Sequence, residues 1–215
     1  IRAMGRQAAT VSGDLAQPDQ MASVVLRASQ ALGPLALLVN NASLFERDEL
    51  STMTAASWRR LIDVNLTSQI FLMQAFGAQS ALPDGASIIN MLDQQMSAPS
   101  PRFFSYAVAK IGLEGATRLA AFALAPRIRV NGIAPGLVLR SGAQTEATFQ
   151  DFQRRMPLGE GLGTDDIVRA VLYLVASPHV TGEILTVDSG QRLIGPGNSR
   201  LTPDLADGNK AGAAF

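Results

Sequence analysis

Tyr106 and Lys110 lie four residues apart in the stretch SYAVAKIGLEG, which is predicted to be helical. Side chains at this spacing share one face of a helix. A protonated lysine near a phenol favours the phenolate, so Lys110 would lower the pKa of Tyr106 from its ordinary value of about 10. Tyr106 is therefore a candidate proton donor. The alternative is a surface lysine whose stem passes a half-buried tyrosine.

Asp93 is the second candidate, because a run typical of a buried strand leads directly into it in the stretch SIINMLDQQM, residues 87 to 96. A carboxylate beside a hydrophobic core requires a partner or a function. Capping of the following segment is the structural alternative.

Composition excludes several other kinds of chemistry. The 215 residues contain no cysteine and one histidine, which excludes disulfides, cysteine nucleophiles and histidine-cluster metal sites, so no metal is expected. A formal net charge of zero gives no electrostatic reason to bind nucleic acid or an anionic membrane. No apolar run approaches the length of a membrane span, and no signal sequence is evident, so the expected location is cytoplasmic.

Short apolar runs alternate with helical patterns along the chain. The predicted strands are residues 7–15, 35–42, 86–93, 127–136 and 183–190, and the predicted helices are residues 18–32, 54–79, 103–125 and 164–177. This order predicts an α/β fold, a doubly wound Rossmann-type parallel sheet with helices on both faces. We expect one domain over residues 1–193 and an irregular tail over residues 194–215. The opening IRAMG is typical of a last helical turn closed by Gly5.

Ligands of such sheets bind outside the carboxyl ends of the strands. Unusual residues fall at the ends of four predicted strands: Asp14, Asn40 with Asn41, Asp93, and Pro135 with Gly136. Each of them alone could be a turn residue or a helix cap. Together they favour a site at this edge of the sheet.

Five motifs, in their order and spacing, resemble the short-chain dehydrogenase/reductase family. They are NNA at residues 40–42, Asn65 in LIDVNLTSQ, Tyr106 with Lys110, VNGIAPG at 130–136 and VTGEILTVDSG at 180–190. The resemblance extends to about Leu193. It implies an NAD(P)-dependent oxidoreductase.

The resemblance also implies roles for single residues. Tyr106 would donate the proton, Lys110 would hold the nicotinamide ribose, and Asn65 would anchor a proton-relay water. The expected cofactor contacts are Asp14 and Leu15 at the adenine, and Asn40, Asn41, Ala42, Pro135 and Gly136 along the dinucleotide, with Tyr106 and Lys110. A homotetramer is also expected, because the two longest predicted helices carry apolar residues on more than one face.

The sequence departs from the family pattern at its beginning. The glycine-rich phosphate loop, the next strand and most of the next helix of the family are absent from these residues. The residues that select NAD or NADP belong to that part. Either the sequence is a piece of a longer chain or the protein is a truncated form. We expect the first, because a sheet that exposes its central strand leaves backbone groups unpaired.

The second departure is Asp93, which stands thirteen positions before Tyr106, where the family usually has a serine. A carboxylate cannot donate a hydrogen bond to a ketone, and its charge would raise the pKa of Tyr106. It suits a substrate that presents N–H groups and accepts its proton on a ring nitrogen. With NNASLF at residues 40–45, this replacement is similar to the pteridine reductase subgroup and its dihydromonapterin and dihydrofolate reductase relatives.

That subgroup implies that Phe45 stacks on the pterin, Ser43 hydrogen-bonds it, and Asp93 works with Tyr106 in proton delivery. Phe45 could instead be a loop residue that covers the sheet edge, and Ser43 a turn residue. The expected function is NADPH-dependent reduction of a pterin or dihydrofolate-like small molecule. The alternatives are a reductase of a carbonyl or alcohol substrate and a non-catalytic dinucleotide-binding scaffold.

Overall fold

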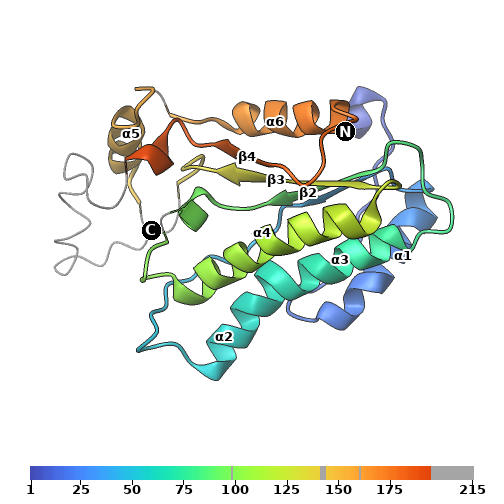
Figure 1. Ribbon diagram of the computed structural model, residues 1–215, viewed down its shortest axis with the longest axis horizontal. Coiled ribbons are helices and arrows are strands. Elements are labelled where there is room, and N and C mark those ends of the chain that lie inside the picture. The colour runs from blue at the N-terminus through green and yellow to red at the C-terminus, as the bar shows by residue number, and fades with distance from the viewer. Residues whose placement is uncertain (98, 141–143, 160, 195–215) are drawn as a thin grey trace.

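A four-stranded parallel sheet forms the centre of the protein (Figure 1). The computed structural model describes residues 1–97, 99–140, 144–159 and 161–194. The strand order is β1 (Leu37–Asn40), β2 (Ser87–Met91), β3 (Arg129–Pro135) and β4 (Ile184–Val187). Four of the five predicted strands are therefore confirmed, and so is the α/β class with a parallel sheet.

Helices cover both faces of this sheet, as the prediction required (Figure 1). On one face lie α3 (Ser68–Gly77) and α4 (Phe104–Leu124), and α1 (Met21–Leu32) packs on α3. On the other face lies α6 (Thr164–Ala176), which contacts β2, β3 and β4. Burial of β2 on both faces explains why its neighbouring residues Ile88 and Ile89 are both apolar.

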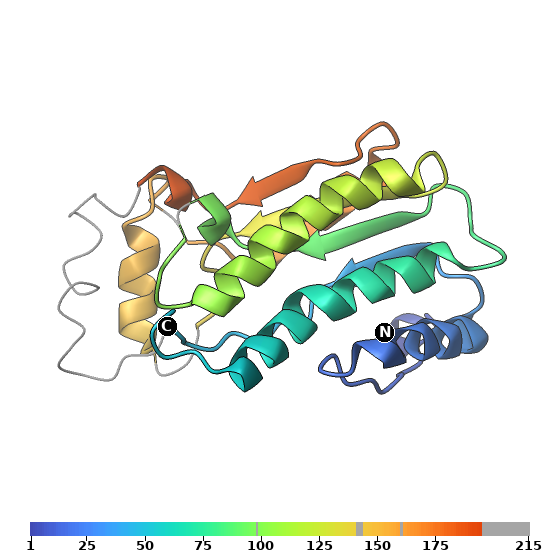
Figure 2. The ribbon, with the colours of Figure 1, turned by 60° about the horizontal axis from the view of Figure 1, so that its bottom comes forward.

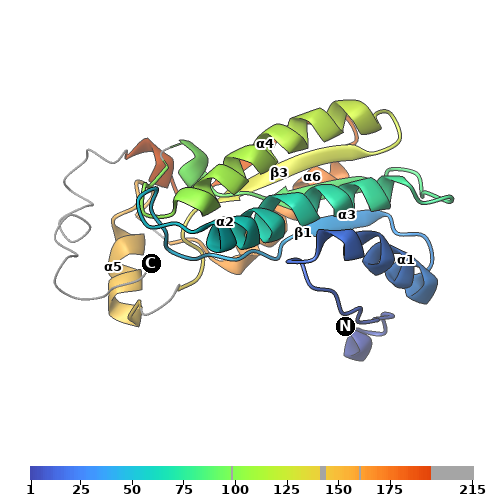
Figure 3. The ribbon, with the colours of Figure 1, turned by 90° about the horizontal axis from the view of Figure 1, so that it is seen from below.

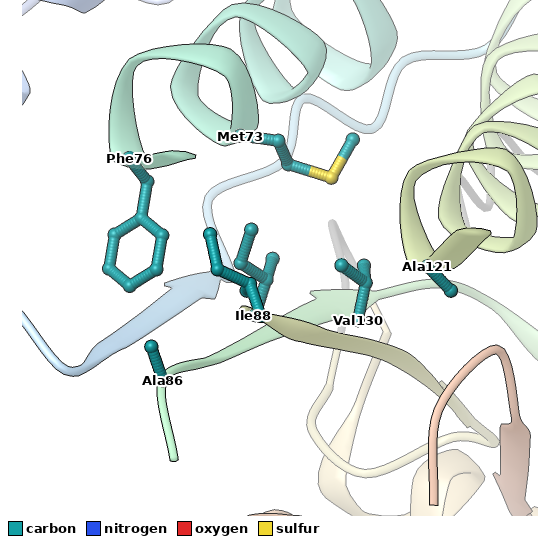
Figure 4. Close-up of a cluster of buried hydrophobic side chains, with 7 residues drawn as sticks. Met73, Phe76, Ala86, Ile88, Ala121 and Val130 are labelled. Atoms are coloured by element: carbon teal, nitrogen blue, oxygen red, sulfur yellow. The ribbon is translucent and has the colours of Figure 1, made fainter. Parts of the chain in front are cut away.

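The core between the sheet and the first helical layer is built from few large side chains. Met73 and Phe76 of α3 pack on Ile88 of β2 and Val130 of β3, beside Ala121 of α4 (Figure 4). Phe76, Ile88 and Val130 are fully buried. This packing fixes the position of α4 over the sheet, and α4 carries Tyr106 and Lys110.

The helix predicted over residues 54–79 is present but changes its hydrogen-bond pattern in the middle. It consists of α2 (Ala55–Ile62), a π-helical turn (η3, Asp63–Thr67) and α3. Thr54 and Ser57 form a capping box at its start. Single π turns inside α-helices are frequent at functional sites. Asn65 lies in this turn.

The strand predicted over residues 7–15 is wrong. These residues form no ladder, and β1 is the edge of the sheet in the described part of the chain. A strand requires a hydrogen-bonded neighbour. In the doubly wound order 3-2-1-4-5-6, residues 7–15 would be the third strand and β1 the fourth, and the third strand pairs with the second, not with the fourth. Residues 7–15 therefore have no strand beside them in the described part of the chain. Figure 3 shows the N-terminal segment outside the layer formed by α3 and the sheet.

Two shorter features complete the fold. The helix α5 (Glu146–Arg154), capped by Thr145, was not predicted and lies beyond the end of the sheet (Figure 1). The 3-10 turns are Arg2–Met4, Pro18–Gln20, Gln94–Ser97 and Gln191–Leu193. Gly5 has φ 70° and closes the first of them, as its sequence predicted.

Apart from Ile194, the predicted tail at 194–215 lies outside the described residues. None of the described helices is long and apolar enough to cross a membrane.

Candidate active site

The carboxyl ends of the strands point toward the end of the molecule where α4 begins (Figure 2). Asp93 follows β2, and Tyr106 lies in the first turn of α4. The residues after β1, from Asn41 onward, pass beside the same turn, because Phe45 contacts the ring of Tyr106. Four predicted site residues, Ser43, Phe45, Asp93 and Tyr106, are therefore brought together.

Asp93 and Tyr106 form the centre of this arrangement. The hydroxyl of Tyr106 donates a hydrogen bond to Oδ2 of Asp93 at 2.7 Å. The other carboxylate oxygen, Oδ1, accepts from the backbone N–H of Gln95 at 2.7 Å, at the start of the 3-10 turn Gln94–Ser97. One oxygen of Asp93 therefore caps the turn and the other binds the tyrosine, while a role of Asp93 in proton delivery stays a prediction.

The electrostatic environment of Tyr106 differs from the expectation that Lys110 would lower its pKa. Burial raises the pKa of Tyr106 far above its ordinary value, and the charge and hydrogen bond of Asp93 raise it further. A hydrogen bond with Ser43 acts weakly in the opposite direction. Burial also raises the pKa of Asp93, against hydrogen bonds from Gln95 and Tyr106 and the charge of Lys110. Both groups are therefore shifted toward their protonated forms.

Lys110 is buried, which excludes the alternative of a surface lysine. Its ammonium donates to the carbonyl oxygen of Met91 at 2.7 Å and lies 5.6 Å from the centre of the Tyr106 ring. Burial lowers the pKa of Lys110 to about 8, although the charge of Asp93 partly opposes this. Met91 accepts one of the three N–H donors, and the others have no hydrogen-bond partner among the described residues. These donors fit the hydroxyl groups of a ribose.

Asn65 holds the loop that follows β1. Its Oδ1 accepts from the hydroxyl of Ser43 at 2.7 Å and from the N–H of Leu44 at 3.0 Å. Its Nδ2 donates to the carbonyls of Leu44 at 2.8 Å and Leu61 at 3.0 Å. Both ends of the side-chain amide therefore hydrogen-bond within the protein, so a water held by Asn65 would have to bind to its main-chain atoms. The anchored-water role stays a prediction.

The aromatic side chains of the site form a packed group. The ring of Phe45 stacks on Phe103 at 4.3 Å with an interplanar angle of 17°. It meets Tyr106 edge-on at 4.8 Å and 84°. Phe103 therefore packs against the ring of Phe45, and this ring lies next to Tyr106, the candidate proton donor. Stacking on a substrate ring stays a prediction.

The residues expected along a dinucleotide lie at the ends of β1 and β3. Asn40 is buried and donates to Oδ1 of Asn90 in β2 at 2.8 Å, whereas Asn41 and Ala42 are exposed. At the end of β3, a Cβ on Gly136 would lie 2.9 Å from the Cα of Asp188, so only glycine fits there. Asn41 and Ala42 are thus accessible to a ligand, whereas Gly136 is needed for the close approach to Asp188.

Asp14 and Leu15 lie apart from this centre. Asp14 is exposed, and its Oδ1 accepts from the N–H of Ala16 at 2.9 Å in a turn. The carbonyl of Leu15 accepts from the hydroxyl of Ser68 at 2.6 Å, which attaches this segment to α3. Their contact with an adenine stays a prediction.

Sequence reasoning did not identify Asp48, Phe103 and Ser105 as parts of the site. Asp48 is buried and accepts a hydrogen bond from the N–H of Ser105 at 3.0 Å. The two residues are 57 positions apart, so no local spacing could have indicated this contact. The arrangement as a whole holds a half-buried acid, a phenol and an ammonium beside an aromatic ring, which suits proton transfer to a flat substrate.

Comparison with known proteins shows the family of this chain. A family model described as enoyl-(acyl carrier protein) reductase matches residues 1–192. An uncharacterized oxidoreductase of Mycobacterium tuberculosis is 34% identical over 95% of this chain and 80% of its own. The 2-dehydro-3-deoxy-D-gluconate 5-dehydrogenase of Escherichia coli is 31% identical over 88% of this chain and 78% of its own.

A solved structure extends the comparison to three dimensions. FolM alternative dihydrofolate reductase 1 from Brucella canis, complexed with NADP, is 36% identical. It superposes with a TM-score of 0.83 over 89% of this chain and 76% of its own. The chain belongs to the short-chain dehydrogenase/reductase family of oxidoreductases.

Proposed function

We propose that this protein reduces a pterin or dihydrofolate-like substrate with NADPH. The observation that carries the proposal is the 2.7 Å hydrogen bond between Tyr106 and the carboxylate of Asp93. A carboxylate at this place accepts N–H groups of a heterocycle and relays a proton, whereas a ketone has no N–H to offer it. The similarity to FolM alternative dihydrofolate reductase 1 supports the same substrate class.

The cofactor contributes a hydride when it is bound, and a C=N bond of the substrate accepts it. The raised pKa of Asp93 lets this carboxyl group hold a proton when substrate excludes water from the site. Protonated Asp93 donates to the oxygen of Tyr106, and Tyr106 transfers its own proton to the ring nitrogen. Phe45 supports the ring by stacking, and Ser43 hydrogen-bonds it.

The residues at the strand ends fit the nicotinamide half of NADP. Lys110 offers its two remaining N–H donors to ribose hydroxyls. Asn40, Asn41 and Ala42, at the end of β1, would lie along one side of the dinucleotide. Pro135 and Gly136, at the end of β3, would lie along its other side. The structure of FolM with NADP supports NADPH as the donor.

The proposal predicts that the purified protein oxidises NADPH in the presence of dihydrobiopterin or dihydrofolate. Steady-state absorbance at the NADPH band measures this, with a small diketone as the comparison substrate. A rate with the diketone but none with either pterin would contradict the substrate assignment and leave the oxidoreductase assignment intact. Binding of NADPH in a fluorescence titration, without oxidation of NADPH by any of these substrates, would instead support the non-catalytic dinucleotide-binding scaffold.

A carbonyl or alcohol substrate is the second candidate. It is favoured by the relatives that are named as dehydrogenases of hydroxylated compounds, such as 2-dehydro-3-deoxy-D-gluconate 5-dehydrogenase. In that case Asp93 would serve only as the cap of the turn that follows β2.

A homotetramer is proposed from two apolar surfaces on opposite sides of the sheet. On α4, Leu119 is 73% exposed and Phe122 is 89% exposed, and on α6, Leu172 and Tyr173 are more than half exposed. Two separate self-complementary surfaces generate a tetramer with dihedral symmetry. Light scattering is expected to give the tetramer mass, and Phe122→Glu to give dimers, with Leu26→Glu on α1, which is 56% exposed, as the matched control. A monomer at micromolar concentration would contradict this.

We also propose a cytoplasmic location, on the sequence grounds given above.

A further inference from the structure

Asp48 provides the N-terminal cap of α4 from a distant part of the chain. Phe103, at the N-cap position, has no side-chain cap interaction. Instead, Oδ1 of Asp48 accepts from the N–H of Ser105 at 3.0 Å, and Oδ2 accepts from the Ser105 hydroxyl. The carbonyl of Asp48 accepts from the N–H of Phe104 at 3.2 Å. Two of the N–H groups that a helix leaves free at its start are therefore satisfied by one residue.

This contact differs from an ordinary cap, in which the capping residue immediately precedes the helix. Here the cap lies 57 residues before Ser105, in the loop that carries Ser43 and Phe45. A parallel backbone bridge joins Asp48 to Phe103, and Phe103 stacks on Phe45. The loop over residues 43–48, here called the substrate loop, is thus attached to the start of α4 by a cap, a bridge and an aromatic stack.

The attachment has a direct consequence for Tyr106, which is the residue after Ser105. Tyr106 lies in the first turn of α4, and the ends of helices fray when their free N–H groups lose their partners. A carboxylate at this end is also favoured by the helix dipole. Asp48 is only 7% exposed, so water cannot easily replace it as an acceptor. Asp48 therefore holds the backbone of Ser105, the residue that precedes Tyr106.

We propose that Asp48 is a positioning residue, which holds the first turn of α4 on the substrate loop and thereby keeps Tyr106 and Phe45 in register. The proposal rests on the proposed role of Tyr106 as proton donor, but it does not require that the substrate is a pterin. Asp48 itself touches neither Asp93 nor the reacting atoms. It acts through Ser105 on one side and Phe103 on the other.

A single ¹⁹F resonance can report the position of Tyr106 without any substrate. The sequence contains two tyrosines, so 3-fluorotyrosine in a Tyr173→Phe background labels Tyr106 alone. Asp48→Asn, which keeps one acceptor, is expected to shift this resonance by more than its line width. Asp48→Ala should shift it further, and Ser105→Ala, which removes only the hydroxyl, should shift it less. Asp166→Asn is the matched control, since Asp166 accepts from Gly163 at the start of α6, on the other face of the sheet.

Kinetics separate positioning from general loss of stability. The kcat is expected to fall about tenfold in Asp48→Asn and about a hundredfold in Asp48→Ala, because a misplacement near 1 Å can cost about 10²-fold. The Kd for NADPH should stay unchanged in both, and Asp166→Asn should keep the kcat of the parent. These rates are measured with whichever of dihydrobiopterin, dihydrofolate and the diketone the parent reduces.

The outcomes distinguish this inference from the proposed function. An unchanged ¹⁹F resonance in Asp48→Asn and in Ser105→Ala would overturn the positioning role, whatever the activity. If Asp48→Asn did not fold, Ser105→Ala would decide the question alone. A shifted resonance in a protein that reduces the diketone but no pterin would support Asp48 as a positioning residue and contradict the pterin assignment.

Discussion

Tyr106→Phe is expected to lower kcat by about 10²–10⁴-fold, the range that general acid catalysis contributes. The substitution removes the hydroxyl that bonds to Asp93 at 2.7 Å and leaves the ring that packs edge-on against Phe45. The Kd for NADPH should change little, because Lys110 keeps its place on the carbonyl of Met91. Single-turnover rates and fluorescence titration measure the two quantities separately.

Tyr173→Phe is the matched control, because Tyr173 is exposed on α6 and the same oxygen is removed. It should keep the rate of the parent. Lys110→Ala should lower both kcat and NADPH affinity, since it removes the ribose donors together with a buried charge. If Tyr106→Phe kept more than about a tenth of the parent kcat, the loss would be smaller than general acid catalysis allows, and another group would have to donate the proton.

The parts of the fold that could be predicted are those whose pattern is local. Ile88, Ile89, Met91 and Leu92 are apolar because β2 is buried on both faces, and this strand was located correctly. The helix from Phe104 to Leu124 was likewise predicted to within one residue at each end. Residues 7–15 carry an equally good strand pattern, yet they form none, because a strand also needs a neighbour. Periodicity shows which side chains could be buried, not which partner is present.

The site shows the same division between local and long-range information. Asp93 and Tyr106 could be paired in advance, because both lie at recognisable places in the family pattern. The charge of Asp93 raises the pKa of Tyr106, as predicted, but the net direction could not be predicted, because Lys110 was expected to act in the opposite direction and burial is the largest cause. Asp48 was also missed, since only the folded chain brings it to Ser105. Electrostatic tuning and distant caps are properties of the tertiary structure.

Asp93→Ser separates the two substrate classes most clearly. The variant restores the usual residue of the family at this position, and it removes the acceptor of the Tyr106 hydroxyl together with the negative charge. Loss of a hydrogen bond to a charged group costs about 1.5–3 kcal/mol, or roughly ten- to a hundredfold in rate. Pterin reduction should therefore fall by at least this factor. Reduction of a small diketone should be no slower, because the serine hydroxyl can donate to a ketone and the pKa of Tyr106 falls when the Asp93 charge is removed.

Asp93→Asn tests whether the carboxyl group transfers a proton or only caps the turn that follows β2. The amide oxygen can still accept from the N–H of Gln95, so the turn after β2 keeps its cap. An amide cannot take up and release a proton near neutral pH, so a relay through this position would stop. We expect Asp93→Asn to lose pterin reduction as Asp93→Ser does, while the Kd for NADPH and the melting temperature stay close to those of the parent. NADPH oxidation with dihydrobiopterin, dihydrofolate and the diketone decides between these two roles of Asp93. Equal pterin rates in the parent and both variants would show that the carboxylate only caps the turn, and the carbonyl substrate would then be the better assignment.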